Sequence, residues 1–155
     1  AALDSIKPAA EAKGIELATH IHEVIPPVLG DAARLQQVVW NLLSNAVKFA
    51  AKNGHVDVTA EATRDAVVVR VKDDGVGIAP DFVPHVFDPF RQDETMKPQQ
   101  GGLGLGLSIV KRMVELHGGR VSACSDGPGS GATFEMRLPC AQGGEPVPGG
   151  VAEAV

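Results

Sequence analysis

Asn41 and Asn45 lie one helical turn apart in a segment whose pattern predicts a long helix from an Asp31 N-cap through Lys52. At about 100° per residue, both fall on a narrow polar stripe opposite an apolar arc of roughly 200°. The other residues of the stripe are Arg34, Gln37, Lys48 and Lys52. An asparagine oxygen suits Mg²⁺, which prefers oxygen ligands and usually shares its shell with phosphates, and a lysine can meet a phosphate as a point charge. The pattern indicates a Mg²⁺–phosphate site, and a solvated stripe with two incidental asparagines is the alternative.

A second pattern joins a carboxylate to a glycine turn. Asp73 comes just after a predicted buried strand and is followed by Gly75 and Gly77, which let the backbone turn sharply and approach a ligand. A carboxylate placed there can accept a hydrogen bond from an exocyclic amine such as that of adenine, and leaving it unpaired in a cleft would be costly. An ordinary acidic turn is the alternative, and the neighbouring Asp74 is expected to be an exposed turn carboxylate.

A third pattern is the glycine-rich run from Gly101 to Leu107, which leads directly into a predicted helix. The first N–H groups of a helix lack internal partners and carry partial positive charge, so glycines before them let phosphate oxygens reach those donors. A P-loop would need lysine after Gly106, and a dinucleotide fingerprint would need glycine at the same position, where the chain has Leu107. The run therefore indicates a phosphate site of another fold.

The rest of the pattern predicts the elements that must position these groups. Residues 73–104 are predicted to be mostly loop with one helical turn after Pro80, and a loop of this length favours a functional role. The other expected elements are a lead-in helix over 1–13 broken by Pro8, a half-buried strand over 15–21, an antiparallel strand pair over 56–61 and 66–71, a helix over 105–117, and a second strand pair over 120–125 and 133–138.

Composition narrows the class of protein. The chain has 155 residues, of which 44% are hydrophobic, so one domain with its own core is expected. The net charge of −5 argues against a nucleic-acid partner, and no apolar run is long enough for a membrane span. Cys124 and Cys140 have no metal-binding or disulfide spacing. We expect a cytoplasmic domain that contacts neither nucleic acid nor membrane.

Together these segments resemble the catalytic ATP-binding domain of sensor histidine kinases, within the wider GHKL family of gyrase, mismatch-repair and heat-shock chaperone ATPases. The motifs that carry the resemblance are an N box at 37–49, a first glycine box at 73–78, an F box at 86–90, a second glycine box at 102–107 and a third at 129–134. Five motifs in this order span roughly residues 15–139. The resemblance implies a two-layer α/β sandwich of the Bergerat type, a mixed sheet of about five strands with helices on one face.

The resemblance also implies roles for individual residues. Asn45 would bind Mg²⁺, with Asn41 near the phosphates of ATP and Lys48 contacting them. Asp73 would read the adenine amine, and Thr133 would assist it from the neighbouring strand. The other ATP-binding residues it implies are Gly75, Gly77 and Ile78 around the base, and Gly102, Leu103, Gly104, Leu105, Gly106 and Leu107 in the second glycine box.

A mobile lid over residues 91–101 is a further implication of the resemblance. Arg91, Gln92 or Lys97 could approach the γ-phosphate there, and no residue is assigned as a catalytic base. Leu103 stands where many family members have threonine, which removes one possible hydroxyl contact and leaves the backbone donors.

The residue type at position 41 favours phosphoryl transfer over ATP hydrolysis within the family. The family's hydrolases carry a glutamate one turn before the Mg²⁺-binding asparagine, whereas Asn41 is neutral and no useful proton acceptor. Phosphoryl transfer needs mainly positioning and charge neutralisation, so the resemblance implies a protein-histidine kinase. His22 matches the acceptor pattern His-Glu-x-x-x-Pro, but it ends a predicted strand before two prolines and is excluded as the acceptor.

The expected organisation is the end of a linker helix from a dimerisation and acceptor domain over 1–13, the ATP-binding domain over 14–139, and a flexible linker tail over 140–155. The expected partners are ATP, the histidine-containing dimerisation domain of the same full-length protein, and a response-regulator receiver downstream. The chain alone is expected to be monomeric with little turnover. The alternatives are a protein-serine kinase of the anti-sigma-factor type and a nucleotide-sensing interaction module without catalysis.

Overall fold

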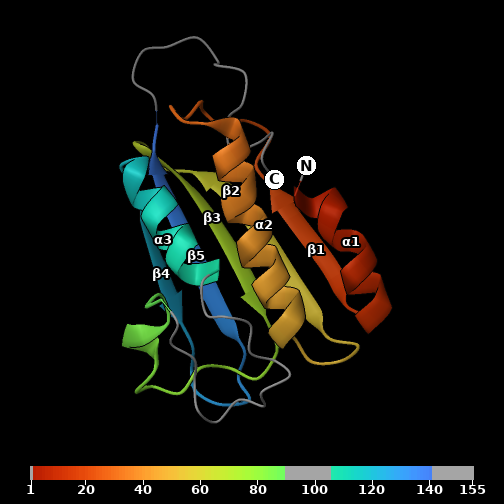
Figure 1. Cartoon of the computed structure of the whole chain (residues 1–155). Helices are drawn as coiled ribbons and strands as arrows, with labels where there is room; N and C mark the ends of the chain where they lie inside the picture. Colours follow the sequence, from red (N-terminus) through yellow and green to blue (C-terminus); the bar gives the residue numbers. More distant parts are fainter. Residues whose placement is uncertain (1, 90–105, 141–155) are drawn as a thin grey trace.

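The structure of the protein is a computed structural model that describes residues 2–89 and 106–140 (Figure 1). The helices and strands follow the predicted order along the chain. They are α1 (Ala2–Lys13), β1 (Glu16–Ile21), α2 (Ala32–Phe49), β2 (His55–Ala62), β3 (Ala66–Asp73), the short 3-10 helix η1 (Val83–His85), α3 (Gly106–Leu116), β4 (Arg120–Cys124) and β5 (Ala132–Pro139). No described helix has the length and apolar character that crossing a membrane requires.

The described strands form one mixed sheet in the order β1-β2-β3-β5-β4. β1 pairs with β2 in parallel, and the other neighbouring strands are antiparallel. Figure 1 shows α1, α2 and α3 side by side on one face of this sheet. The predicted two-layer α/β sandwich with five strands is therefore confirmed, as is the predicted antiparallel pairing of β2 with β3.

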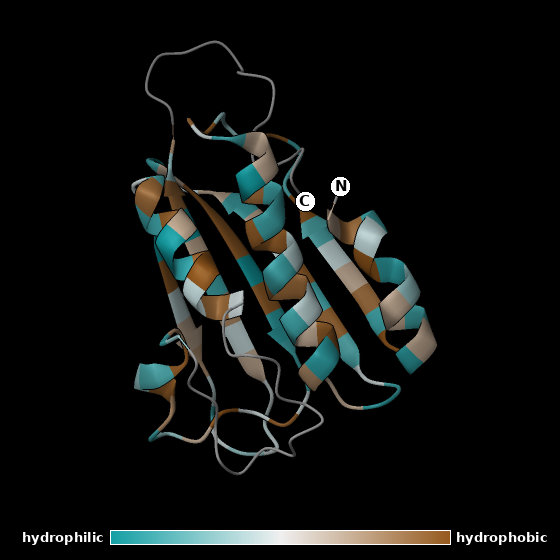
Figure 2. Cartoon of the chain, in the orientation of Figure 1, coloured by the Kyte–Doolittle hydropathy of each residue, from teal (hydrophilic) through white to brown (hydrophobic). Residues whose placement is uncertain are grey.

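The core between the two layers is aliphatic, and α2 lies at its centre. Apolar residues recur along α2 and α3 (Figure 2), and the residues that the wheel placed on the apolar arc of α2 are all at most 5% exposed, namely Leu35, Val38, Val39, Leu42, Leu43, Ala46, Val47 and Ala50. Burying a Leu or Val side chain contributes about 1.5–3 kcal/mol, so this face fixes the rotation of α2. The polar stripe consequently stays at the partly exposed side of the helix.

α1 runs through Pro8 without a break, so the predicted interruption at this residue is wrong. A proline inside a helix costs about 3 kcal/mol, because it removes a hydrogen bond and crowds the preceding turn. Pro8 lies on the exposed side of α1, whereas Ala2, Ile6 and Ala10 are buried in the core. The free energy gained by burying this opposite face outweighs the cost of placing proline inside a helix.

α2 ends at Phe49, three residues before the predicted end at Lys52. Ala50 already has an extended backbone with φ −62° and ψ 153°, and Asn53 lies in the left-handed region with φ 60°. The chain therefore leaves the helix early and turns sharply into β2. Lys52 lies in this turn and not on the polar stripe of α2.

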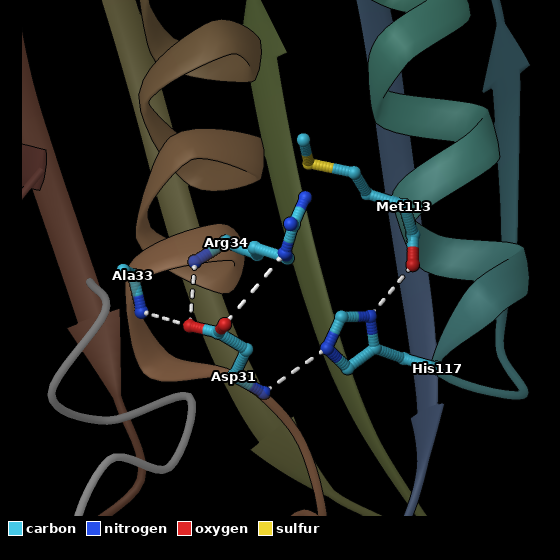
Figure 3. A network of polar contacts seen from close by, with 5 residues as sticks. All are labelled: Asp31, Ala33, Arg34, Met113 and His117. Atoms are coloured by element: carbon cyan, nitrogen blue, oxygen red, sulfur yellow. Dashed lines mark hydrogen bonds and ion pairs between the residues drawn. The ribbon is translucent and has the colours of Figure 1, made fainter.

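The N-terminus of α2 is fastened to the C-terminus of α3, as Figure 3 shows. The Asp31 carboxylate accepts hydrogen bonds from the backbone N–H groups of Ala33 and Arg34, at 3.0 and 3.3 Å. The Asp31 backbone N–H donates to His117 Nε2 at 3.2 Å, and His117 Nδ1 lies 2.7 Å from the Met113 carbonyl. These partners require the neutral tautomer with the proton on Nδ1.

Replacing Asp31 with alanine is expected to lower the free energy of unfolding by about 1 kcal/mol, because two N–H groups of the first turn lose their acceptor. The measurement is urea unfolding followed by circular dichroism. Asp31→Asn is the matched control, since its side-chain oxygen can still cap the helix and the backbone bond to His117 remains. An equal loss in both variants would contradict the capping role.

Candidate functional site

The polar stripe of α2 faces outward as the helical wheel predicts. Asn41, Asn45 and Lys48 are all partly exposed, and within residues 2–89 and 106–140 neither asparagine side chain has a hydrogen-bond partner. Lys48 Nζ lies 5.2 Å from the centre of the Phe49 ring, at a distance typical of a cation–π contact. The carboxamide oxygens are thus available to a ligand, and the helix that carries them is anchored by its buried face.

The first glycine box closes directly on the end of α2. The Val76 N–H donates to the Phe49 carbonyl at 3.1 Å, which satisfies one of the carbonyls that a helix end leaves without an internal partner. This approach needs a glycine at position 75, because a Cβ there would collide with the same Phe49 carbonyl. The turn after β3 and the last turn of α2 therefore form one unit at the lower end of the molecule in Figure 1.

The third glycine box is hydrogen-bonded to the first. The Gly131 N–H donates to the Gly75 carbonyl at 3.1 Å, and the Gly129 N–H donates to the Val76 carbonyl at 2.8 Å. Gly131 has a φ of 72°, in the left-handed region that favours glycine. Two motifs more than fifty residues apart in the sequence are thus held together by backbone contacts.

Ser125 joins these two glycine boxes through its side chain and was missed by the sequence analysis. Its hydroxyl accepts the Ile78 N–H at 3.0 Å and lies 2.7 Å from the Gly131 carbonyl, to which it donates. The available signal was a serine at the strand end before a glycine-rich turn, where serine side chains often bond to nearby backbone. Ser125 is a positioning residue for the predicted base-binding turn.

Asp73 is a buried carboxylate at the start of this turn. The residue is 3% exposed, and one carboxylate oxygen accepts the Gly75 N–H at 2.9 Å. Burial raises the pKa of Asp73 above its ordinary value and Asp74 adds to this rise, whereas the N–H groups of Gly75 and Ala132 and the charge of Lys13 oppose it. Few hydrogen-bond donors compensate the cost of burying this carboxylate, so a further donor from a ligand would be favourable.

Thr133 is not brought together with Asp73. The register of β3 and β5 pairs Asp73 with Ala132, and it pairs Thr133 with Lys72. Side chains alternate between the two faces of a strand, so Thr133 belongs to the face opposite Asp73. The residue beside Asp73 on the neighbouring strand is Ala132, which has no hydroxyl to offer.

Asp74 is exposed, as predicted, and it also has a structural partner. Its carboxylate accepts the His55 N–H at 2.9 Å, which fastens the start of β2 to the turn after β3. The tight spacing at this junction extends to Gly54, where a Cβ would collide with the Asp74 carboxylate. Asp74 therefore supports the turn from outside, while Asp73 lies within it.

The F box packs against the same end of the sheet. Phe87 contacts Phe134 of β5 edge to face, with ring centres 6.1 Å apart, and Val86 is buried. His85 Nδ1 and the Asp88 carboxylate lie 3.1 Å apart across η1. The segment before the predicted lid is thus attached to the core.

Several predicted site residues lie outside the described part of the chain. These are the lid candidates Arg91, Gln92 and Lys97, and Gly102, Leu103, Gly104 and Leu105 of the second glycine box. Gly106 is the first residue of α3, and Leu107 packs against the core. The end of this glycine run therefore coincides with a helix N-terminus, the geometry in which backbone N–H groups can face an anion.

Comparison with known proteins adds independent findings. The sequence family described as histidine kinase-, DNA gyrase B- and HSP90-like ATPase matches residues 30–142. The chain is 35% identical over 132 residues to the alginate biosynthesis sensor protein KinB of Pseudomonas aeruginosa, covering 85% of the chain and 22% of that protein. It is 39% identical over 142 residues to the sensor protein TorS of Escherichia coli, covering 91% of the chain and 15% of that protein. The chain spans less than a quarter of either relative.

Solved structures agree with this match. The mycobacterial sensor histidine kinase MprB superposes with a TM-score of 0.77 at 28% identity, covering 90% of this chain and 93% of that one. Full-length ShkA in complex with AMPPNP superposes with a TM-score of 0.79 at 36% identity, covering 94% of this chain and 30% of that one. The fold is that of histidine kinase ATPase domains, and the chain belongs to the family of histidine kinase-, DNA gyrase B- and HSP90-like ATPases.

Proposed function

We propose that this chain is the Mg·ATP-binding catalytic domain of a sensor histidine kinase, which transfers the γ-phosphate to a histidine on a separate domain. The observation that carries the proposal is the junction of three motifs at one end of the sheet. The last turn of α2, the turn after β3 and the turn before β5 are joined by backbone hydrogen bonds around the buried Asp73. The names of the relatives, sensor proteins and sensor histidine kinases, support the same function.

The adenine end of the proposed site lies at Asp73. An ionised carboxylate accepts hydrogen bonds only, so it can bind the exocyclic amine of adenine and disfavours the carbonyl that guanine presents at the same place. Gly75 and Gly77 allow the close backbone packing of this turn, because a Cβ would collide with the Phe49 carbonyl at position 75 and with the Gly127 carbonyl at position 77. In this proposal the backbone of both glycines lines the base. In this proposal Ile78, which is 8% exposed, contributes apolar surface to the base.

The phosphate end lies along the polar stripe of α2. The residues present fit Mg²⁺, since two carboxamides without partners in the described part of the chain offer neutral oxygen ligands and leave room for waters and phosphate oxygens. Asn45 would hold the ion, and the ion would neutralise phosphate charge during transfer. Asn41 would lie near the phosphates, and Lys48 would leave the Phe49 ring to contact them.

Transfer in this proposal depends on positioning, because the stripe carries no proton acceptor. Asn41 is neutral and cannot orient water as a base. The attacking nitrogen comes from a histidine of another domain, a bond forms between that nitrogen and the γ-phosphorus, and the β–γ bridging oxygen leaves with ADP. A histidine-containing dimerisation domain and a downstream response-regulator receiver are the partners that this function requires.

Asn45→Ala is expected to weaken the Mg²⁺ enhancement of AMPPNP binding by about tenfold or more, since one ligand of the ion is removed. Trp40, the single tryptophan, precedes Asn41 on α2 and is 41% exposed, so its fluorescence can report the titration. Gln37→Ala is the matched control, because it removes a carboxamide two turns earlier on the same stripe. An unchanged Mg²⁺ dependence in Asn45→Ala would contradict the metal assignment.

The acceptor is tested on the full-length protein incubated with labelled ATP. A phosphohistidine is lost in acid and survives alkali, whereas a phosphoserine survives acid. Acid-labile label supports the histidine kinase, and acid-stable label on a separate protein would support a serine kinase. Binding of nucleotide without any label on the full-length protein would support a sensing module.

A further inference from the structure

The last turn of α2 is satisfied by an unusual set of donors. A helix leaves its final carbonyl groups without internal partners, and a glycine often closes the end. Here the chain continues from Ala50 in an extended conformation. The Phe49 carbonyl receives the Val76 N–H of the first glycine box, as described above. The carbonyls of Val47 and Lys48 require donors from elsewhere.

Lys13, the last residue of α1, supplies them. Its ammonium group donates to the Val47 carbonyl at 3.0 Å and to the Lys48 carbonyl at 2.8 Å. A positive charge at this place also interacts favourably with the negative end of the helix dipole. Desolvation by burial lowers the pKa of Lys13, while the negative charge of Asp73 raises it. The Lys13 side chain therefore caps the last turn of α2. This turn carries Lys48 and comes directly after Asn45.

The backbone around Lys13 is held as firmly as its side chain. The Lys13 carbonyl accepts the Asn53 N–H at 3.2 Å, so the turn after α1 is fastened to the turn after α2. Gly14 follows with a φ of 72°, and a Cβ there would collide with the Asn53 side chain. With both backbone and side chain fixed, a shift of α1 has to move the last turn of α2.

We propose that Lys13 is a positioning residue for the Mg²⁺–phosphate end of the nucleotide site, through which the position of α1 sets the orientation of Asn45 and Lys48. The inference rests on the proposed function of these two residues. It adds a dependence on a residue that lies outside every nucleotide-binding motif. The adenine end is joined to α2 through the Val76 N–H, and Lys13 acts on it through its charge near Asp73 and not through a hydrogen bond, so it should depend on Lys13 less.

The test compares the affinities of Mg·AMPPNP and of adenosine, which lacks phosphates. Lys13→Met is expected to weaken Mg·AMPPNP binding by about tenfold, because a charged donor to two carbonyls is lost. Adenosine binding is expected to weaken by at most about twofold, because there only the charge interaction with Asp73 is lost. Lys13→Arg, which keeps the charge and donors, is expected to recover most of the affinity. Lys7→Met is the control, since Lys7 is exposed on the same helix and pairs with Asp4 of that helix.

The outcomes distinguish a failure of the proposed function from a failure of the positioning role of Lys13. Wild-type protein that binds neither ligand would overturn the proposed function itself. Wild-type protein that binds both, with Lys13→Met weakening them equally or not at all, would overturn the positioning role alone. If Lys13→Met does not fold, Lys13→Gln replaces it, because glutamine keeps a donor group, its neutral amide NH2. The same selective loss, at smaller size, is then expected, and an equal loss of both ligands would again overturn the inference.

Discussion

Replacing Asp73 with asparagine is expected to weaken AMPPNP binding by about 10- to 100-fold, which corresponds to the loss of a charged hydrogen bond of about 1.5–3 kcal/mol. The asparagine oxygen can still accept the Gly75 N–H that the carboxylate accepts in the structure. Its amide nitrogen then carries donors toward the adenine amine, which is itself a donor. Titration calorimetry with AMPPNP measures the loss.

The same substitution is expected to stabilise the nucleotide-free protein at neutral pH. Because burial raises the pKa of Asp73, the folded state binds the proton more tightly than the unfolded state. The stability contribution of this group is therefore present at acid pH and is lost as the pH rises from the ordinary carboxyl range through the raised pKa. The asparagine side chain cannot ionise, so the melting temperature of Asp73→Asn should exceed that of the wild type at pH 7 and lose this advantage at low pH.

Asp74→Asn is the control for both measurements. Asp74 is the adjacent carboxylate, it is exposed, and its contact with the His55 N–H can be kept by an asparagine oxygen. We expect nearly unchanged AMPPNP affinity in this variant. Equal losses in both variants, or an Asp73→Asn protein that binds as tightly as the wild type, would contradict the assignment of Asp73 as the adenine-reading residue.

Gly75→Ala is expected to lower the free energy of unfolding by about 1–3 kcal/mol or more, because the packed structure leaves no space for the new methyl group. It would collide with the Phe49 carbonyl and with the Ala50 Cα, both of them backbone atoms that cannot rotate away. Relief requires the turn after β3 to separate from α2, which breaks the bond between the Val76 N–H and the Phe49 carbonyl. Guanidinium unfolding measures the effect, and nucleotide affinity should fall with it.

Gly106→Ala provides the matched glycine substitution. A Cβ at Gly106 meets no atom of the described residues within 4 Å, and alanine favours a helix over glycine by about 1 kcal/mol. Its stability should be equal to or above that of the wild type. If Gly75→Ala is as stable as Gly106→Ala, then the first glycine box is not packed against α2 as described.

The sequence predicted the elements well wherever one strong periodicity decided them. The apolar arc of α2 is one case, since every residue assigned to it is buried, and the alternating strands 56–61 and 66–71 are another. Pro8 was predicted wrongly because its local cost is visible in the sequence, whereas the burial of Ile6 and Ala10 on the other side of α1 is a tertiary effect. The early end of α2 has the same origin, since the donors that cap it come from other elements.

In the candidate site, too, some residues could be predicted from sequence motifs, whereas others depend on contacts that only the fold creates. The motifs led to Asn41, Asn45 and Asp73 as site residues, because their residue types suit the proposed chemistry. Motif spacing could not show that Thr133 falls on the other face of β5, because that depends on the register with β3. It also could not indicate Ser125 or Lys13, whose partners lie 6 to 47 and 34 to 35 residues away along the chain. Such contacts follow from the fold and have no local signature.

Titration calorimetry of the wild-type chain with Mg·AMPPNP and with Mg·GMPPNP tests whether the chain has the proposed adenine-specific nucleotide site. We expect saturable binding of Mg·AMPPNP at one site per chain, tighter with Mg²⁺ than without it, and much weaker binding of the guanine analogue, whose carbonyl would face the Asp73 carboxylate. A folded wild-type chain that binds neither analogue, or that binds both equally well, would contradict the proposed site.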